Sequence, residues 1–450
     1  MDITLFTLII YLIIMFSVAW FFSRKQSLGS YFLNKKKTSL WLMVFSTVTT
    51  IVGAGATVGI VSEVYNSGVS YGLALPISFI VGMFVLGIVA KKIKTIGDEY
   101  DAHTIVDFFY KRFDKKTGAL TAVLQLFLIT IWIGMQALAI ASLASVLIGV
   151  EFQVALLLAA VITIAYTAIG GLKVDIITDF IQFWIILGVF IIMAVFGYGH
   201  VGSFSNLLSQ LPQGHLDPFA FGGISWFVGV ILLSGFLYLG NTSNWQRIFS
   251  AENEAVAKNS FFWAMPFILL LSMLMLFFGL IAAITLSGIN QDKAIFSLMN
   301  VILPPSLVGI GFAALLAVTM SSIDSMLIGG STIIHRVIFK QKNLNSTKEL
   351  LYAKIITVLF GIFGFIAAYF IPSIVTLSLI VTYLALIFVP PIFAGIYSQK
   401  ISANASFYAI LIPSILLFTL YSFMGENTFV VTTPIGILII LLYDKIFKTK

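Results

Sequence analysis

The sequence predicts an all-α integral membrane protein with about 13 transmembrane helices, and three observations support this fold class. First, 60% of the 450 residues are hydrophobic and only 10% are charged, whereas a soluble domain carries about 25% charged residues. Second, apolar stretches of about 20 residues, the length that crosses a bilayer, recur along the whole chain. Third, the basic residues alternate between loops as membrane topology requires.

Short loops separate thirteen apolar segments. The segments lie near 3–22, 40–62, 71–90, 118–147, 154–170, 176–197, 222–241, 261–287, 306–334, 350–371, 374–397, 403–423 and 428–443. The first segment has no basic region before it and is too long for a cleaved signal peptide, so we interpret it as a span.

Nearly all basic residues fall in the loops after odd-numbered segments. If the N-terminus is outside and the C-terminus cytoplasmic, only Lys293 of the 25 Lys and Arg residues lies on the outer side. This positive-inside pattern predicts a multi-pass protein of the cell membrane with that orientation. We therefore interpret the net charge of +7 as an orientation signal. We therefore expect the lipid bilayer as a partner, with no nucleic acid and no obligate protein partner.

Two segments contain small residues at mid-membrane depth, at 53–59 and at 234–242. Glycine destabilises a helix by about 1 kcal/mol relative to alanine, and paired interrupted helices in the two halves of a transporter point to its binding site. Because the two segments lie five spans apart, the second group of five spans would be an inverted copy of the first. Close helix packing is the alternative interpretation.

Carboxylates inside the predicted spans are the next feature, since ionisable groups in a bilayer are costly and typically functional. Asp179 enters the sixth segment from the cytoplasmic side, and Asp175, one turn earlier, is expected nearer to water. Asp324 lies in the ninth segment within 319–325, which also holds four hydroxyl residues. These oxygens predict an alkali-cation site, with structural hydrogen bonding as the alternative.

We do not expect an enzyme. The chain has no cysteine, which excludes thiol catalysis and thiolate metal sites, and it shows no Ser/His/Asp arrangement. Asp179 and Asp324 could act as the acid and base of an intramembrane protease, but such an enzyme would not require a ten-span inverted repeat.

Four short motifs together resemble the sodium:solute symporter family, which includes sodium/galactose, proline, pantothenate and sialic acid transporters. They are Tyr31-Phe32-Leu33, the GG, TD and Q positions within 170–182, Asn244-Trp245-Gln246-Arg247, and the serine-rich run 321–327. The resemblance implies a LeuT-type core of five plus five inverted spans. Residues 1–39 would form the first span and an inner loop, 40–197 and 198–400 the two repeats, and 401–450 two C-terminal spans.

The resemblance also implies a sodium-driven symporter that works by alternating access, and it implies a sodium site. The ligands would be the hydroxyls of Ser321 and Ser322 and the backbone carbonyls of Thr49, Val52 and Val318. Asp179 and Asp324 would support this site. Because Val318 stands where family members with a second sodium carry a hydroxyl, we expect one Na⁺ per cycle.

The solute is less constrained by the sequence. Ile51, Gly55 and Ala56 surround the first break, so a hydrogen-bonded sugar site is disfavoured. A small solute such as an amino acid or a monocarboxylate would suit the N–H groups of half-helices. The candidate contacts are Thr50, Gly53, Thr57, Phe236, Tyr238 and Asn241. A proton-coupled transporter of the same fold and a transport-derived solute sensor are the alternatives.

Overall fold

The computed structural model describes residues 3–24, 26–339, 346–370 and 374–447, and every regular element in these ranges is helical. Residue 371 of one predicted span and five of the basic residues lie outside these ranges: Lys25, Lys340, Lys342, Lys448 and Lys450. The helices are α1 (Ile3–Ser23), α2 (Leu28–Leu33), η1 (Asn34–Lys36), α3 (Leu40–Ile51), α4 (Ala54–Ser67), α5 (Val69–Tyr100), α6 (Ile105–Arg112), α7 (Lys115–Ile148), α8 (Phe152–Val201), α9 (Phe204–Gln210), α10 (Gly223–Leu233), η2 (Ser234–Tyr238), α11 (Thr242–Ser250), α12 (Glu254–Thr285), η3 (Gln291–Lys293), α13 (Ala294–Ile302), α14 (Pro305–Phe339), α15 (Ser346–Ala367), η4 (Ala368–Phe370), α16 (Ile374–Ile387), α17 (Val389–Tyr397), α18 (Ala403–Met424), η5 (Gly425–Asn427) and α19 (Phe429–Phe447).

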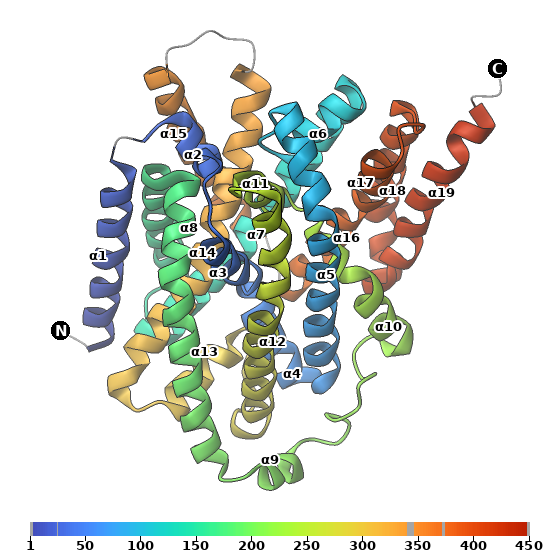
Figure 1. Cartoon of the computed structure of the whole chain (residues 1–450). Helices are drawn as coiled ribbons and strands as arrows, with labels where there is room; N and C mark the ends of the chain where they lie inside the picture. Colours follow the sequence, from blue (N-terminus) through green and yellow to red (C-terminus); the bar gives the residue numbers. More distant parts are fainter. Residues whose placement is uncertain (1–2, 25, 340–345, 371–373, 448–450) are drawn as a thin grey trace.

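The long helices run side by side along a common direction (Figure 1). Among the described residues, ten helices are long and apolar enough to cross a membrane, or twelve if each of two bent helix pairs is one span. The 50-residue helix α8 is interrupted at Gly171, whose backbone is non-helical (φ 61°, ψ −175°). A straight helix of that length would measure about 75 Å, against a hydrocarbon core of about 30 Å. The all-helical membrane fold is confirmed, and the count of thirteen, which requires α8 to cross twice, stays a prediction.

Both predicted helix breaks are present. Helices α3 and α4 are bent by 43° around residues 52–53, and the α10–η2 segment is bent by 52° from α11. At Gly53 an added Cβ would lie 2.3 Å from the Ser322 hydroxyl oxygen and 2.8 Å from Gln136 Nε2. Glycine at this position therefore allows close approach of α14 and α7 to the break.

The second break is held against α5 by contact between backbones. A Cβ on Gly235 in η2 would lie 1.9 Å from the Ser78 carbonyl oxygen of α5, and one on Gly82 in α5 would lie 2.1 Å from the Gly235 carbonyl oxygen. Small residues at such crossings allow two backbones to pack closely. The interrupted segment is thus fixed in place even though it lacks regular α-helical hydrogen bonds.

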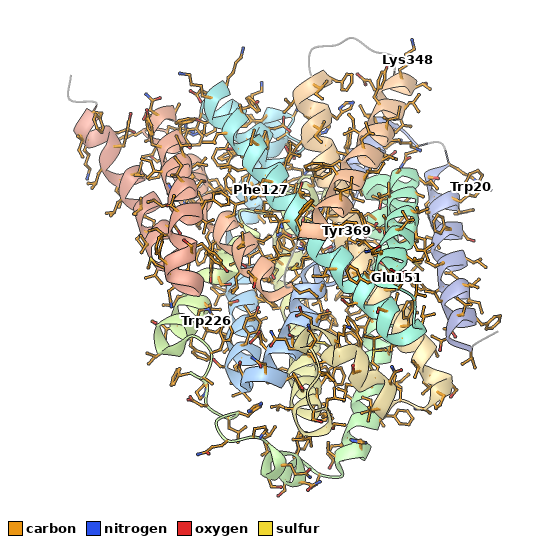
Figure 2. All side chains as sticks on the ribbon, turned by 180° about the vertical axis from the view of Figure 1, so that it is seen from behind. Trp20, Phe127, Glu151, Trp226, Lys348 and Tyr369 are labelled. Atoms are coloured by element: carbon orange, nitrogen blue, oxygen red, sulfur yellow. The ribbon has the colours of Figure 1, made fainter. Side chains whose placement is uncertain are left out.

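The periphery is apolar. Helix α1 buries only Thr4, Tyr11, Met15 and Ala19, four residues on one face. Its other face presents large apolar side chains such as Trp20, which is 63% exposed and projects outward in Figure 2. Lipid can cover such a surface, and this explains why the chain has so few charged residues.

Replacing Gly235 with alanine should destabilise the protein, because the new methyl group would collide with the α5 backbone. Overpacking costs about 1–3 kcal/mol, so we expect a lower melting temperature for purified Gly235→Ala protein. Gly188→Ala in α8 is the matched control, since nothing lies within 4 Å of an added Cβ there. Equal melting temperatures for the two variants would contradict the close packing of η2 on α5.

Candidate functional site

Oxygen atoms gather where α3 ends against the middle of α14. The Ser321 hydroxyl oxygen lies 3.1 Å from the Thr49 carbonyl oxygen and 3.1 Å from that of Val318. The Ser322 hydroxyl oxygen lies 3.1 Å from the Thr50 carbonyl oxygen and 3.4 Å from that of Val318. We call these five oxygens the oxygen cluster. Hard cations bind such groups.

The end of helix α3 explains why carbonyls are available there. The last carbonyls of an α-helix have no intrahelical partner, and this end carries partial negative charge. Val52 leaves the helical conformation (φ −81°, ψ 46°) after its N–H donates to the Val48 carbonyl. The carbonyls of Thr49 and Thr50 accept from the two serines instead. Thr49, Val318, Ser321 and Ser322 thus lie together as predicted, and Thr50 contributes a carbonyl that the resemblance did not assign.

A fully buried arginine lies beside this cluster. Arg247 of α11 donates from Nη2 to Asp179 of α8 at 3.4 Å and to the Ser325 hydroxyl of α14 at 2.7 Å. Its Nε donates to the Ser46 hydroxyl of α3 at 3.0 Å, and Ser46 in turn donates to Asp179 at 2.5 Å. Asp175 lies 3.9 Å from the same guanidinium. One cation therefore joins four helices.

Two sequence-based expectations are wrong here. Asp175 was expected nearer to water, but it is 3% exposed and accepts a hydrogen bond from the Ser325 hydroxyl at 3.0 Å. Arg247 was assigned to a cytoplasmic loop, but α11 is the half-helix after the second break and its Arg247 side chain is buried in the protein. The two carboxylates compensate the loss of hydration of the arginine, and a buried charge requires such partners.

Thr50 connects the charged group to the oxygen cluster. Its hydroxyl accepts a hydrogen bond from Arg247 Nη2 and lies 3.3 Å from the Ser325 hydroxyl oxygen. Its carbonyl accepts from Ser322. Thr50, at the end of α3, therefore contacts both Arg247 and the oxygen cluster.

Asp324 lies apart from both groups. It is buried, and one carboxylate oxygen accepts a hydrogen bond from the Thr167 hydroxyl of α8. Its Oδ2 has no hydrogen-bond partner within the described parts of the chain, and the same is true of Asp179 Oδ1. Asp324 thus contacts α8, whereas Ser321 and Ser322 contact α3.

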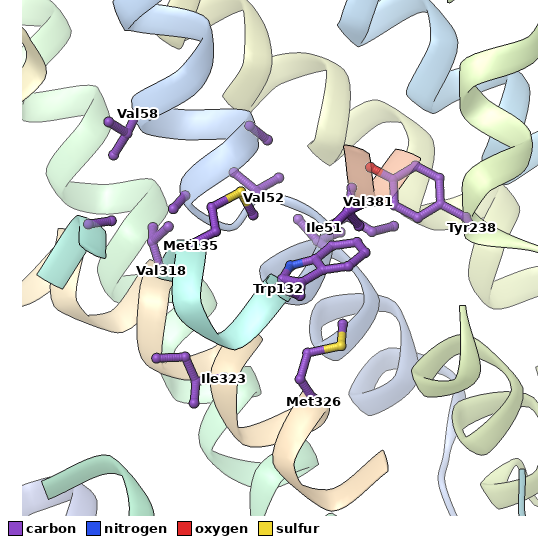
Figure 3. Close-up of a cluster of buried hydrophobic side chains, with 14 of the residues drawn as sticks. Ile51, Val52, Val58, Trp132, Met135, Tyr238, Val318, Ile323, Met326 and Val381 are labelled. Atoms are coloured by element: carbon purple, nitrogen blue, oxygen red, sulfur yellow. The ribbon is translucent and has the colours of Figure 1, made fainter. Parts of the chain in front are cut away.

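A cavity of about 40 Å³ lies beside the first break. Its walls come from α3, α4, α5, α7, η2 and α16, and Thr50, Gly53 and Tyr238 from the predicted solute contacts are among its lining residues. In Figure 3 the indole of Trp132 lies beside Ile51 and Val381, and the Tyr238 hydroxyl is directed toward Val381.

The other three predicted solute contacts lie elsewhere. The Thr57 hydroxyl donates to the Gly53 carbonyl at 2.9 Å. Phe236 lines a separate apolar pocket with Phe393. The Asn241 side chain accepts from the Ser243 N–H at 2.9 Å and so caps α11.

Two residues of α7, Trp132 and Gln136, line the cavity and were missed by sequence reasoning. The Gln136 side-chain oxygen accepts from the Ala54 N–H at 2.8 Å, at the start of α4. An amide within an apolar span was the available signal, because an unpaired amide is costly in a membrane. It was not used, since nothing in the sequence pairs the fourth segment with the second.

Two broken helices beside a cavity, next to a cluster of oxygens of the kind that hard cations bind, are typical of a secondary transporter. A model described as the sodium:solute symporter family matches residues 31–413. The chain belongs to this family, and the protein is a transporter and not an enzyme. Sodium is the coupling ion that the family implies, and a small solute is the cargo.

Individual relatives agree with this assignment. The chain is 27% identical over 458 residues to a sodium/pantothenate symporter of Haemophilus influenzae, which covers 96% of this chain and 90% of the relative. It is 29% identical over 383 residues to a sodium/glucose cotransporter of Vibrio parahaemolyticus, covering 76% and 69%. A solved structure of a Na⁺-coupled sialic acid symporter in a substrate-bound outward-open state matches with a TM-score of 0.85 and 17% identity, over 99% of this chain and 98% of that chain. The fold is therefore of the LeuT type.

Replacing Arg247 with glutamine should strongly destabilise the protein, because it leaves Asp175 and Asp179 buried without their cation. Removing one partner of a buried ion pair costs about 3–5 kcal/mol. We expect a large drop in melting temperature, partly reversed in the double variant Arg247→Gln/Asp179→Asn. The control is Lys91→Gln, which breaks an exposed pair with Glu254 worth about 0–1 kcal/mol. An Arg247→Gln protein that melts like Lys91→Gln would show that the buried ion pair is not structurally required.

Proposed function

We propose that the protein is a sodium-coupled symporter that imports a small organic solute, an amino acid or a monocarboxylate, by alternating access. The observation that carries this proposal is the oxygen cluster at the end of α3, next to the solute cavity. Sodium would take the place of the hydrogen bonds from Ser321 and Ser322, so that hydroxyl and carbonyl oxygens face the ion together. We further propose one Na⁺ per cycle, because Val318 brings only its carbonyl to the cluster.

Coupling between ion and solute follows from shared residues. Thr50 offers its carbonyl to the oxygen cluster and lines the cavity, and Gly53 touches both Ser322 and Gln136. Sodium that orders this break would raise solute affinity, and the solute would raise sodium affinity by the same factor. Each ion that enters with the membrane potential supplies about 2.3 kcal/mol per 100 mV.

We also propose a cell-membrane location with the N-terminus outside and the C-terminus cytoplasmic. The distribution of loop Lys and Arg residues supports this orientation. Arg247 is in the protein core and does not count as a loop cation. The positive-inside pattern remains without it, because the other loop Lys and Arg residues still alternate.

Proton coupling is the second candidate, and one observation favours it. Asp179 and Asp324 each have a buried carboxylate oxygen without a hydrogen-bond partner in the described structure. A proton on such an oxygen would remove the buried charge. The two candidates differ in which cation the protein responds to.

Sodium should stabilise the purified protein against heat more than potassium does at equal ionic strength. Ser322→Ala should raise the sodium concentration for half-maximal stabilisation at least about tenfold, because a hydrogen bond or ligand to a charged group is worth about 1.5–3 kcal/mol. The control is Ser331→Ala on the same helix, a buried serine that bonds to the Ile328 carbonyl, and it should respond to sodium like the wild type. Equal stabilisation by sodium and potassium, together with a response to pH, would overturn sodium coupling in favour of protons.

A further inference from the structure

We infer that the solute is a short monocarboxylate anion without an amino group, and that Gln136 and Trp132 hold its carboxylate. This inference rests on the proposed transport function and narrows it to one class of solute. It depends on two observations. Two buried N–H donors in the cavity have no hydrogen-bond acceptor in the described structure, and backbone carbonyls at the two helix breaks already accept hydrogen bonds from the protein.

The two N–H donors without an acceptor lie on one face of α7. Trp132 and Gln136 are one helical turn apart, so their side chains lie on the same side of the helix. Both line the cavity and both are more than nine-tenths buried. Within the described structure, Trp132 Nε1 and Gln136 Nε2 have no hydrogen-bond partner. Buried N–H groups without an acceptor are unfavourable, so these two are available to a ligand with acceptor oxygens.

The hydrogen bond that Gln136 Oε1 accepts fixes the orientation of the side-chain amide. Its Oε1 accepts from the Ala54 N–H at 2.8 Å, and only the oxygen of an amide can accept such a bond. Nε2 must therefore be the free end. It lies beside Gly53, where an added Cβ would be 2.8 Å away.

The start of α4 adds positive potential at the same place. Helix α4 is 14 residues long and begins at Ala54, and a helix N-terminus carries roughly half a positive charge. An anion placed beside Gly53 would meet this potential together with the donors of Gln136 and Trp132. It would also lie next to Ser322 of the oxygen cluster, where the charge of a bound sodium attracts it.

An ammonium group, by contrast, finds hydroxyl acceptors in this cavity, such as Thr50, Ser378 and Thr382, but no carboxylate from the described part of the chain. None of the described lining residues is acidic or basic. Four backbone carbonyls at the breaks are already engaged: Gly53 accepts from Ala56 and Thr57, Tyr238 from Asn244, Leu239 from Trp245 and Gly240 from Gln125. A buried cation without a charged partner is unfavourable. The site therefore selects against amino acids.

The size of the cavity limits the rest of the molecule. The cavity has a volume of about 40 Å³, which suits a small solute. Ile51, Leu75, Phe79 and Val381 form apolar walls that suit a short aliphatic chain.

The test compares three solutes of equal size: L-lactate, L-alanine and lactamide, which carry a carboxylate alone, a carboxylate with an ammonium, and a neutral amide. Binding to the purified full-length protein is measured by calorimetry in sodium and in potassium buffers. Uptake of radiolabelled lactate is measured in proteoliposomes with an imposed sodium gradient. We expect lactate to bind at least about tenfold more tightly than the other two, only in sodium, and to accumulate with the gradient.

Two variants test the assigned donors. Gln136→Glu keeps the acceptor for Ala54 and replaces the Nε2 donor with a carboxylate oxygen, and Trp132→Phe removes the indole N–H while keeping an aromatic ring. Each should weaken lactate binding at least about tenfold and retain thermal stabilisation by sodium, which shows that the variant is folded. The matched controls are Gln153→Glu and Trp20→Phe, the same changes at exposed positions, and they should bind lactate like the wild type.

The outcomes separate this inference from the proposed function. The inference is overturned if alanine or lactamide binds as tightly as lactate, if lactate does not bind, or if both α7 variants keep wild-type affinity for lactate. Stabilisation by sodium would then still support symport. If sodium neither stabilises the protein nor drives uptake, the proposed function itself fails.

Discussion

The guanidinium of Arg247 is the group on which the arrangement of the core depends. It is fully buried, and its partners come from α3, α8 and α14, while its own helix α11 follows the second break. A charge in such a place is tolerated only with compensating carboxylates and hydrogen bonds. Asp175 and Asp179 provide the charge, and the hydroxyls of Ser46, Thr50 and Ser325 receive or share the remaining bonds. These contacts fix the two interrupted helices relative to α8 and α14, and so they define where the ion and the solute can bind.

Hydrogen bonding of the interrupted backbone explains why the two sites lie side by side. When α3 ends, its last carbonyls lose their intrahelical partners, and Ser321 and Ser322 take them over. When α4 begins, its first N–H groups lack acceptors, and the Gln136 oxygen takes one of them. The negative end of one half-helix thus faces the proposed cation site, and the positive end of the other faces the proposed anion site. Gly53 lies between them, so that the proposed ion and solute would carry opposite charges at adjacent positions.

The sequence predicted the features that depend on local composition. Apolar length gave the spans, small residues gave both breaks, and a serine-rich run within α14 identified Ser321 and Ser322. Features that depend on packing between distant segments could not be predicted. The sequence around Arg247 is typical of a loop cation, and only the bend before α11 shows that its side chain lies in the core. Asp175 is one helical turn from Asp179 in α8, and the sequence does not show that both are buried. Likewise, the sequence does not show that Gln136 and Trp132 of α7 lie against Gly53. It also does not show that Phe236 faces another pocket or that Asn241 caps a helix.

The central claim is that sodium orders the junction between α3 and α4. The most direct measurement is hydrogen–deuterium exchange of backbone amides in residues 49–57, compared in sodium and in potassium at equal ionic strength. Sodium bound to the oxygen cluster should slow exchange in this segment, because opening the break would then require losing the ion, and Ser322→Ala should abolish the difference. Identical exchange rates in the two salts, in a wild-type protein that is folded in both, would contradict the account.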